Sequence, residues 1–323
     1  MAEDSTNEVA SATPAEAEEK PLIEELTPDV APTVQEFMAE SAHANESQAE
    51  AIAQDGDLSA GAGLAAASFA TPDTVAPFIA FENVCKSFGD FVVLKDVSFF
   101  VNPGETLCIL GRSGVGKSVS LQILMGFLKP DSGTVLVAGQ DIAGLSEGEM
   151  QQVRRKVTMV FQNGALFDSI TVGENVAFPL RERGDMEEDQ ILLVVKGLLE
   201  MVGVAGIENV LPSDLSTGMK RSVAIARALA AQPSAVLYDE PTTMVDPLMA
   251  HLLGNLIQRL KAQLHLTSIV VTHDMRFAEK LADRVVFLHE GTARFFGTTG
   301  QMRKGEDPIL REFLNLDELV LPT

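Results

Sequence analysis

The feature that most constrains this chain is a glycine-rich stretch at residues 111–118, which reads Gly-Arg-Ser-Gly-Val-Gly-Lys-Ser. It follows the apolar run 106–110, typical of a strand buried on both faces of a parallel sheet, and precedes a helix-like segment at 119–126. The stretch matches G-x-x-x-x-G-K-[ST] in the strand–loop–helix context that this pattern requires. We therefore predict an α/β fold with a phosphate-binding loop at the end of one buried strand.

The chemistry of such a loop assigns roles to its residues. Glycines allow main-chain N–H groups to converge on phosphate oxygens, and the next helix directs the positive end of its dipole at them. Lys117 is predicted to place its charge on the β- and γ-phosphates, and Ser118 to offer a hydroxyl to Mg²⁺. The candidate ATP-binding residues of this segment are Gly111, Arg112, Ser113, Gly114, Val115, Gly116, Lys117, Ser118 and Val119.

Polar side chains also follow the ends of two further strand-like runs. Residues 235–239 lead into Glu240, and residues 268–272 lead into His273. Ligands of open α/β sheets bind at the carboxyl ends of the strands, so these groups should lie beside the loop. Each could be an ordinary solvated or structural group, but the loop requires a carboxylate on its metal side. We predict that Asp239 holds Mg²⁺ through water, that Glu240 polarises the attacking water and that His273 contacts phosphate.

A second candidate phosphate site begins about a hundred residues after Lys117. The stretch 215–219 opens a helix-like run with Ser216 followed by small residues, and a helix N-terminus of this kind binds anions. Ser216 could equally be an ordinary helix cap. Between the two sites, a strand-like segment ends in the amide of Gln162.

In this order, the motifs resemble those of the ATP-binding subunit of ABC transporters over about residues 79–300. The resemblance implies a catalytic role for two residues, a carboxylate and a switch histidine. It also implies an aromatic residue that stacks on adenine. The implied positions are Walker A at 111–118, the adenine-stacking Phe88, the Q-loop and Mg²⁺ ligand Gln162, Walker B ending at Asp239, the catalytic Glu240, the D-loop Asp246 and the switch His273.

In the same family, the stretch 215–219 would be the signature loop, which contacts ATP held by a second subunit. Its residues are Leu215, Ser216, Thr217, Gly218 and Met219, where the family usually has Leu-Ser-Gly-Gly-Gln. The serine and the second glycine are retained. Thr217, Met219 and the D-loop pair at 244–245 depart from the family pattern, and we expect them to tune turnover without abolishing it.

The resemblance also implies a domain organisation. An ATP-binding domain would span 78–300, with a mostly parallel P-loop core, an antiparallel β subdomain and an inserted helical subdomain at about 163–232. A C-terminal tail would occupy 301–323. Because the chain has one Walker A motif and no internal repeat, it needs a second copy or a paralogue. We expect a homodimer with composite ATP sites, using ATP and Mg²⁺ and attached to transmembrane permease subunits.

Finer similarity narrows the cargo. Residues 161–181 are similar to the Q-loop segment of ATPases in Mce/Mla-type lipid transport systems. This implies phospholipid transport between inner and outer membranes, with a periplasmic Mce-type lipid-binding protein in the complex. Leu166, Phe167 and Ile170 would line the groove for the permease coupling helix, unless they are simply core of the helical subdomain. Two alternatives stay open: an ABC importer ATPase for another small cargo such as amino acids, and a soluble ABC ATPase acting on ribosomes or DNA.

The charge of the chain argues against nucleic acid as a partner. The formal net charge is −22, and binding to phosphate backbones requires clustered Lys and Arg. Residues 1–78 hold sixteen acidic residues and one basic residue, so most of the acidity belongs to the N-terminal arm, residues 1–77. The arm has few large apolar residues, and we predict that it is mostly disordered. A stretch at 33–52 could form a transient helix, with Val34, Phe37 and Met38 on one loose face.

Targeting signals and membrane spans are not apparent in the sequence. The acidic start lacks the positive region of a secretory signal and the arginines of a transit peptide, and no run of 18 apolar residues occurs. With the family resemblance, this predicts a peripheral protein on the cytoplasmic face of the inner (plasma) membrane. Cys85 and Cys108 lie in strand-like runs outside any C-x-x-C pattern, which favours small buried side chains in a reducing compartment.

Overall fold

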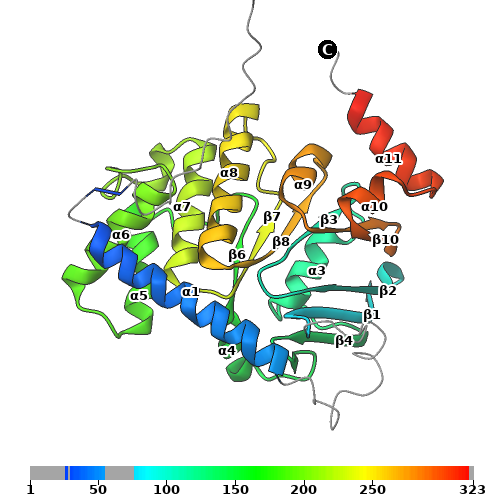
Figure 1. Ribbon diagram of the computed structural model, residues 1–323, viewed down its shortest axis with the longest axis horizontal. Coiled ribbons are helices and arrows are strands. Elements are labelled where there is room, and N and C mark those ends of the chain that lie inside the picture. The colour runs from blue at the N-terminus through cyan, green and yellow to red at the C-terminus, as the bar shows by residue number, and fades with distance from the viewer. Residues whose placement is uncertain (1–25, 28–29, 55–75, 320–323) are drawn as a thin grey trace, which may run out of the picture.

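The computed structural model describes residues 26–27, 30–54 and 76–319 (Figure 1). Two sheets form a core, and a group of helices lies beside them. The larger sheet has six strands in the order β10-β9-β3-β8-β7-β6, and the smaller is antiparallel in the order β2-β1-β4-β5. The predicted α/β class, with a mostly parallel sheet, an antiparallel β unit and a separate helical group, is confirmed.

Parallel pairing dominates the six-stranded sheet. Its strands are β6 (Val157–Val160), β7 (Ala235–Asp239), β8 (Thr267–Thr272), β3 (Thr106–Leu110), β9 (Arg284–His289) and β10 (Thr292–Thr298), of which only β10 is antiparallel to its neighbour. All five residues of β3 are buried because alternate side chains enter different apolar cores. Cys108 and Leu110 face one core, and Leu107 and Ile109 face the other.

The register brings the carboxyl ends of the central strands together. Leu110 pairs with Thr272, and Asp239 pairs with Val271. The residues that follow β3, β7 and β8 therefore emerge at the same edge of the sheet. The site described below is built at this edge.

The antiparallel sheet covers one face of the P-loop core. It consists of β1 (Ile79–Phe88), β2 (Phe91–Val101), β4 (Ser132–Val137) and β5 (Gln140–Asp141). The rings of Phe81 and Phe99 stack across β1 and β2 with centroids 4.5 Å apart. This pair lies in the same apolar core as Leu107 and Ile109, which attaches the small sheet to the large one.

Helices flank the sheets and form the separate group. α3 (Lys117–Leu124) follows the glycine-rich loop, and α4 (Glu147–Lys156) begins at a capping box on Ser146. The helical lobe consists of α5 (Val172–Arg183), α6 (Glu188–Met201) and α7 (Thr217–Ala230), with the short 3₁₀ helix Pro212–Asp214 before α7. The remaining helices are α8 (Pro247–Leu264), α9 (Met275–Leu281), α10 (Thr299–Arg303) and α11 (Pro308–Leu319).

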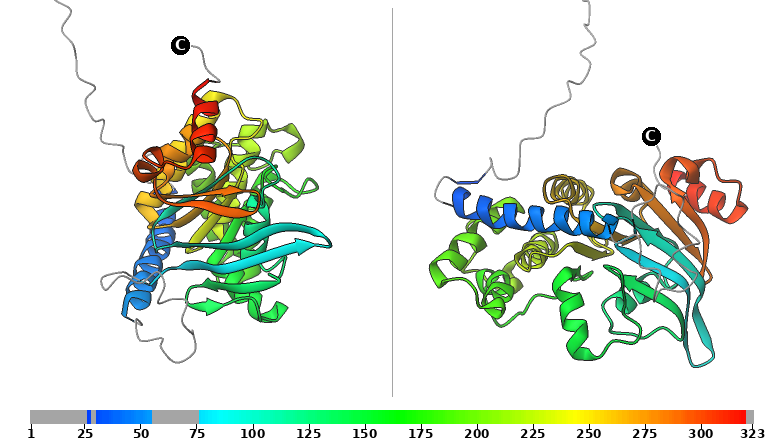
Figure 2. Two further views of the ribbon diagram at one scale, coloured as in Figure 1. Left: turned by 90° about the vertical axis from the view of Figure 1, so that its right-hand side faces the viewer. Right: turned by 60° about the horizontal axis from the view of Figure 1, so that its bottom comes forward.

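Within the N-terminal arm, which we predicted to be mostly disordered, residues 31–54 are helical, over nearly the same range as the stretch 33–52 that the sequence indicated as a possible transient helix. This segment forms α1 (Ala31–Gln54), a helix that lies along the helical lobe and packs on α6 and α8 (Figures 1 and 2). Val34, Phe37 and Met38, the loose apolar face seen in the sequence, are buried there. The surface that receives them comes from distant segments, so sequence composition alone understated their burial. The rest of the arm, 1–25, 28–29 and 55–75, lies outside the described residues.

None of the helices within the described ranges combines the length and apolar character needed to cross a membrane.

Candidate active site

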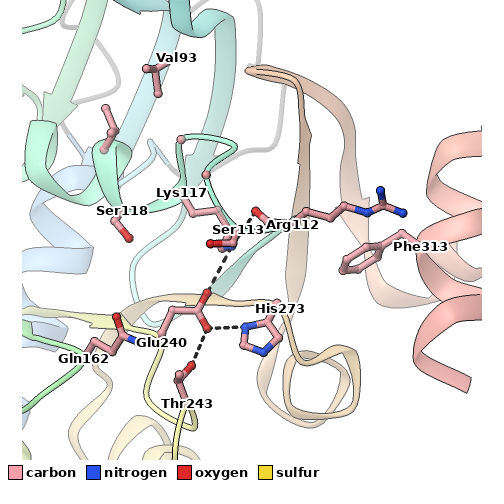
Figure 3. A pocket seen from close by; sticks show the side chains of 13 residues that line it. Val93, Arg112, Ser113, Lys117, Ser118, Gln162, Glu240, Thr243, His273 and Phe313 are labelled. Atoms are coloured by element: carbon pink, nitrogen blue, oxygen red, sulfur yellow. Dashed lines mark hydrogen bonds and ion pairs between the residues drawn. The ribbon is translucent and has the colours of Figure 1, made fainter. Parts of the chain in front are cut away.

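The glycine-rich loop and the residues after β6, β7 and β8 surround a cleft of about 680 Å³ (Figure 3). Most of its polar lining comes from the positions that the sequence singled out. The lining residues are Val93, Arg112, Ser113, Gly114, Gly116, Lys117, Ser118, Val119, Gln162, Glu240, Thr243, His273 and Phe313.

The loop contains positions that only glycine can occupy. Gly116 has φ +104°, and a Cβ there would lie 2.7 Å from Leu94 Cδ2. The loop then turns into α3, and the ammonium of Lys117 folds back to donate to the main-chain oxygens of Gly111 at 2.9 Å and Arg112 at 3.1 Å. With its side chain only 5% exposed, Lys117 presents a fixed positive charge on the floor of the cleft.

Glu240 is the hub of the polar contacts in the cleft (Figure 3). Its Oε1 lies 3.3 Å from Lys117 Nζ, and its Oε2 accepts a hydrogen bond of 3.1 Å from Thr243 Oγ1. The same Oε2 lies 2.8 Å from Nδ1 of His273. Because an ionised carboxylate only accepts, Nδ1 donates, and Nε2 of the ring is left for another partner. The side chain of Glu240 is 13% exposed, so its charge is compensated mainly by these neighbours.

Asp239 and Ser118 form a second polar pair beside this hub. Ser118 Oγ donates to Asp239 Oδ1 at 2.8 Å. Burial raises the pKa of the Asp239 carboxyl above its usual range; the Ser118 hydrogen bond opposes this, while the Glu240 charge adds to it. A buried carboxylate whose charge is disfavoured would be relieved by a cation. Hydroxyl, carboxylate and amide oxygens, the last from Gln162 in the cleft lining, are ligands that Mg²⁺ accepts.

Arg221 is a site residue that the sequence reasoning missed. It lies on α7, is 3% exposed, and donates to the main-chain oxygen of Glu240 at 2.8 Å and to that of Thr243. Arg221 stands five positions after Ser216, like any buried residue of a helix, so the local sequence gives no indication that it belongs to the site. Val93, Thr243 and Phe313 were not predicted as site residues either. Thr243 lies in the turn after Glu240, whereas Val93 and Phe313 reach the cleft through the tertiary fold.

Phe88 is not among the residues that line the cleft. It ends β1, is 47% exposed, and its ring has Lys86 Nζ 5.5 Å from its centroid. The adenine-stacking role of Phe88 therefore stays a prediction. Gly111 and Val115 support the loop from outside the lining, since a Cβ on Gly111 would meet Val115 Cγ2 at 2.8 Å.

The signature stretch 215–219 also lies outside this cleft. Ser216 caps α7 by accepting a hydrogen bond from Met219 N at 3.3 Å, which is the ordinary role that the sequence left open. Asp246 likewise caps α8 by accepting from Met249 N at 2.9 Å. Neither observation tests a contact to a second subunit.

The predicted groove residues occupy the loop between β6 and α5. Leu166 and Ile170 are half-buried, and Leu166 packs on the apolar core that includes the helical lobe. Phe167 is 46% exposed and lies 5.3 Å, centroid to centroid, from the equally exposed Phe178. The loop is held by Asn175, whose amide exchanges hydrogen bonds with the main chain of Phe167. Part of this apolar surface is thus open to solvent.

Comparison with known proteins supports one family. The chain matches the family model described as ABC transporter over residues 94–243. It is 39% identical over 233 residues to the intermembrane phospholipid transport system ATP-binding protein MlaF of Haemophilus influenzae, covering 72% of this chain and 88% of that protein. It is 40% identical over 252 residues to the chloroplastic protein TRIGALACTOSYLDIACYLGLYCEROL 3 of Arabidopsis thaliana, covering 72% of this chain and 71% of that one.

Solved structures agree with these relatives. A dimeric ATP-binding cassette in a post-hydrolysis state, bound to ADP and Pi, matches the fold with a TM-score of 0.64 and 32% identity. The match covers 68% of this chain and 98% of that one. The chain belongs to the ABC transporter family, as a subunit that binds ATP and whose hydrolysis of ATP drives transport.

Proposed function

We propose that this chain powers phospholipid transport between inner and outer membranes as a homodimer bound to transmembrane permease subunits. Its similarity to MlaF, which extends over 88% of that phospholipid transport protein, supports the cargo. A periplasmic Mce-type lipid-binding protein belongs to the proposed complex. The chain would lie on the cytoplasmic face of the inner membrane, where Phe167 and its exposed neighbours would receive the permease.

One observation supports a site shared between two chains of a dimer. The cleft contains the loop, Glu240 and His273 of this chain, while the N-terminus of α7 at Ser216 and Gly218 lies outside it. That helix end carries free N–H groups and a positive dipole that favour an anion. A second copy placed head to tail would bring these N–H groups to the phosphates in the cleft. The dimeric cassette with ADP and Pi is a solved protein of the same fold.

In the proposed site, the residues of this chain divide the work. Ser118, Gln162 and, through water, Asp239 would hold Mg²⁺, which when bound supplies positive charge to the phosphate oxygens. When nucleotide binds, Lys117 would leave its ion pair with Glu240 and contact the γ-phosphate instead. Glu240 is thereby freed to orient the attacking water and accept its proton.

His273 links this base to the phosphate. Its Nδ1 is occupied by Glu240, so Nε2 is the ring atom that can contact the γ-phosphate. The predicted contact therefore depends on Glu240 remaining the partner of Nδ1.

A mixing experiment tests the composite site. Lys117→Ala should remove the loop function and Gly218→Asp the function of the α7 N-terminus, so each variant alone should be inactive. A heterodimer of the two has one site in which both contributing halves are wild-type. We expect the mixture to recover ATPase activity. A mixture that forms heterodimers, as tagged co-purification shows, and yet stays inactive would contradict a site shared between chains.

The cargo is tested on the intact complex. We expect the complex purified with this chain to contain phospholipid identified by mass spectrometry, together with a periplasmic lipid-binding subunit. An amino acid or another small solute in place of lipid would instead support the importer alternative.

A further inference from the structure

The helix α1 contacts both the helical lobe and α8, two parts of the molecule that are far apart in the sequence. Its N-terminal half lies on α6 of the helical lobe, where Val34 fills the space above Gly197. A Cβ on Gly197 would stand 2.1 Å from Val34 Cγ2, so this approach requires the glycine. Before the helix, the main-chain N and Oγ1 of Thr27 donate to the carboxylate of Glu200 at 2.9 and 3.0 Å. This end of α1 is therefore attached to the lobe.

Two residues of α1, one in each half of the helix, contact the turn that joins α7 to β7. Gln232 Nε2 donates to the main-chain oxygen of Phe37 at 2.7 Å, and Ser234 Oγ donates to Gln48 Oε1 at 2.5 Å. The turn is the exit of the helix that begins at the signature loop. It is also the entrance to the strand that ends at Asp239.

The C-terminal half of α1 caps α8 in the core. The last carbonyls of a helix have no partner within it, and Asn45 Nδ2 donates to one of them, Leu264 O, at 2.9 Å. Next to this bond, Glu46 Oε1 lies 3.0 Å from Nε2 of His265, the residue that ends α8 with φ +50°. Asn45 is 6% exposed, so this contact is part of the packed interior.

The docked face of α1 is specific. Val34, Phe37 and Met38 are at most 4% exposed and belong to the same apolar core as the helical lobe and α8. The opposite face carries the exposed acids Glu36 and Glu40. A helix with one buried apolar face and one charged face is ordered by the surface that it covers.

These attachments lie at the far ends of two helices whose near ends would contact the nucleotide in the proposed dimer. α7 has 14 residues and begins at the signature loop; α8 has 18 and begins at Asp246. At 1.5 Å per residue, they extend about 21 and 27 Å from the α1 contacts to the loops at their starts. A small rotation of the lobe at the α1 contacts would therefore move the proposed signature loop relative to the P-loop core.

We propose that α1 is an intramolecular clasp that holds the helical lobe in the orientation seen in this structure and so restrains the basal ATPase. This proposal depends on the shared site proposed above, because the signature loop acts on the nucleotide of a second chain. The contacts of α1 to both the lobe and the core favour the arrangement seen in the structure over any in which the lobe has rotated. Releasing α1 removes that bias.

Gly197→Ala in the full-length chain tests the clasp, because the new methyl group occupies the space of Val34 without altering α1. We expect faster hydrogen exchange of residues 34–48 and a basal ATPase rate raised about fivefold or more. Adding Val34→Ala removes the atom that would stand 2.1 Å from the new methyl group and leaves the Cβ of residue 34 at 3.1 Å, so it should restore much of the protection and the low rate. Gly148→Ala is the matched control, since a Cβ at that helical glycine meets no atom within 4 Å.

A purely structural role for α1 would give a different result. Gly197→Ala would then lower the melting temperature and leave the rate of the folded protein unchanged or reduced, and either outcome overturns the clasp. The mixing experiment distinguishes the two proposals. Recovery of activity in the mixture with no effect of Gly197→Ala refutes the clasp alone, whereas failed recovery refutes the shared site on which it depends.

Discussion

The guanidinium of Arg221 donates a 2.8 Å hydrogen bond to the main-chain oxygen of Glu240. A second bond reaches the main-chain oxygen of Thr243, so Arg221 closes the turn that follows β7. Glu240 has φ +49° in this turn, a conformation that residues with side chains rarely adopt. Arg221 lies on α7, and it therefore joins the helix that follows the proposed signature loop to the backbone of Glu240, the proposed catalytic carboxylate.

Arg221→Met should lower kcat by about tenfold or more with little change in the KM for ATP. The substitution keeps the length of the side chain but removes two hydrogen bonds from a charged donor, each worth about 1.5–3 kcal/mol. The turn would relax and the carboxylate of Glu240 would no longer be held in position, while Lys117 and the glycine-rich loop would still bind nucleotide. Steady-state phosphate release measures both constants. Arg303→Met, which removes an exposed arginine paired with Glu279, is the control. An unchanged kcat in folded Arg221→Met protein would refute the role.

Glu240→Gln should bind ATP and hydrolyse it about 100-fold more slowly or worse, because the amide cannot accept the proton of water. It also frees Lys117 from its ion pair, so affinity for ATP should be kept or increased. Binding of a fluorescent nucleotide and phosphate release separate the two effects. Lys117→Ala is the complementary variant, which should lose binding itself. Hydrolysis at the wild-type rate in Glu240→Gln would assign the base to another group.

Asp239→Asn should raise the melting temperature of the nucleotide-free protein, by about 2–4 °C per kcal/mol gained. The pKa of Asp239 is raised by burial, so the folded protein holds this proton to higher pH than the unfolded chain does. Its contribution to stability is complete below the usual Asp pKa and is lost as pH rises through the raised pKa. The asparagine removes this loss at neutral pH.

The same variant should lose most of the stabilisation that ATP with Mg²⁺ gives, since a neutral amide is a poorer partner for the cation. Thermal melts at acidic and neutral pH, with and without Mg²⁺ and ATP, check both expectations. If nucleotide-free Asp239→Asn were less stable than the wild type at neutral pH, the charge of Asp239 would not destabilise the folded protein.

Asn175→Ala should destabilise the chain by about 2–4 kcal/mol and loosen the exposed loop that carries Phe167. Asn175 is fully buried and bonds both the N–H and the oxygen of Phe167, besides the oxygen of Thr171 at 2.9 Å. Denaturant unfolding measures the loss. If this loop receives the permease, the variant should keep ATPase activity as a free dimer and lose its stimulation in the complex. Stimulation equal to that of wild type would separate the loop from the permease.

The site at the sheet edge was predictable because its information is local. A buried strand followed by a glycine-rich loop places Lys117 without knowledge of the rest of the chain, and parallel pairing brings Glu240 and His273 to the same edge. Family resemblance adds predicted roles that the residue types alone leave open, such as that of Gln162 as a Mg²⁺ ligand.

What the sequence did not show depends on partners far along the chain. Val34, Phe37 and Met38 were visible as an apolar face, yet the acidic composition around them favoured disorder because their receiving surface on α6 and α8 is assembled only in the fold. The contacts of Arg221 likewise join residues about twenty positions apart through a turn whose shape no propensity predicts. Phe313 reaches the cleft from α11 because its ring packs on Phe287, with centroids 4.9 Å apart.

The meeting of Val34 with Gly197 also constrains how such sequences can diverge. A glycine inside a helix costs about 1 kcal/mol relative to alanine, and in α6 that cost is offset only while α1 occupies the space above it. An orthologue that lost the arm could regain alanine at this position. One that keeps the arm must hold the summed volume of the two side chains nearly constant. Positions 34 and 197 should therefore covary through evolution, so that glycine at 197 occurs together with the N-terminal arm.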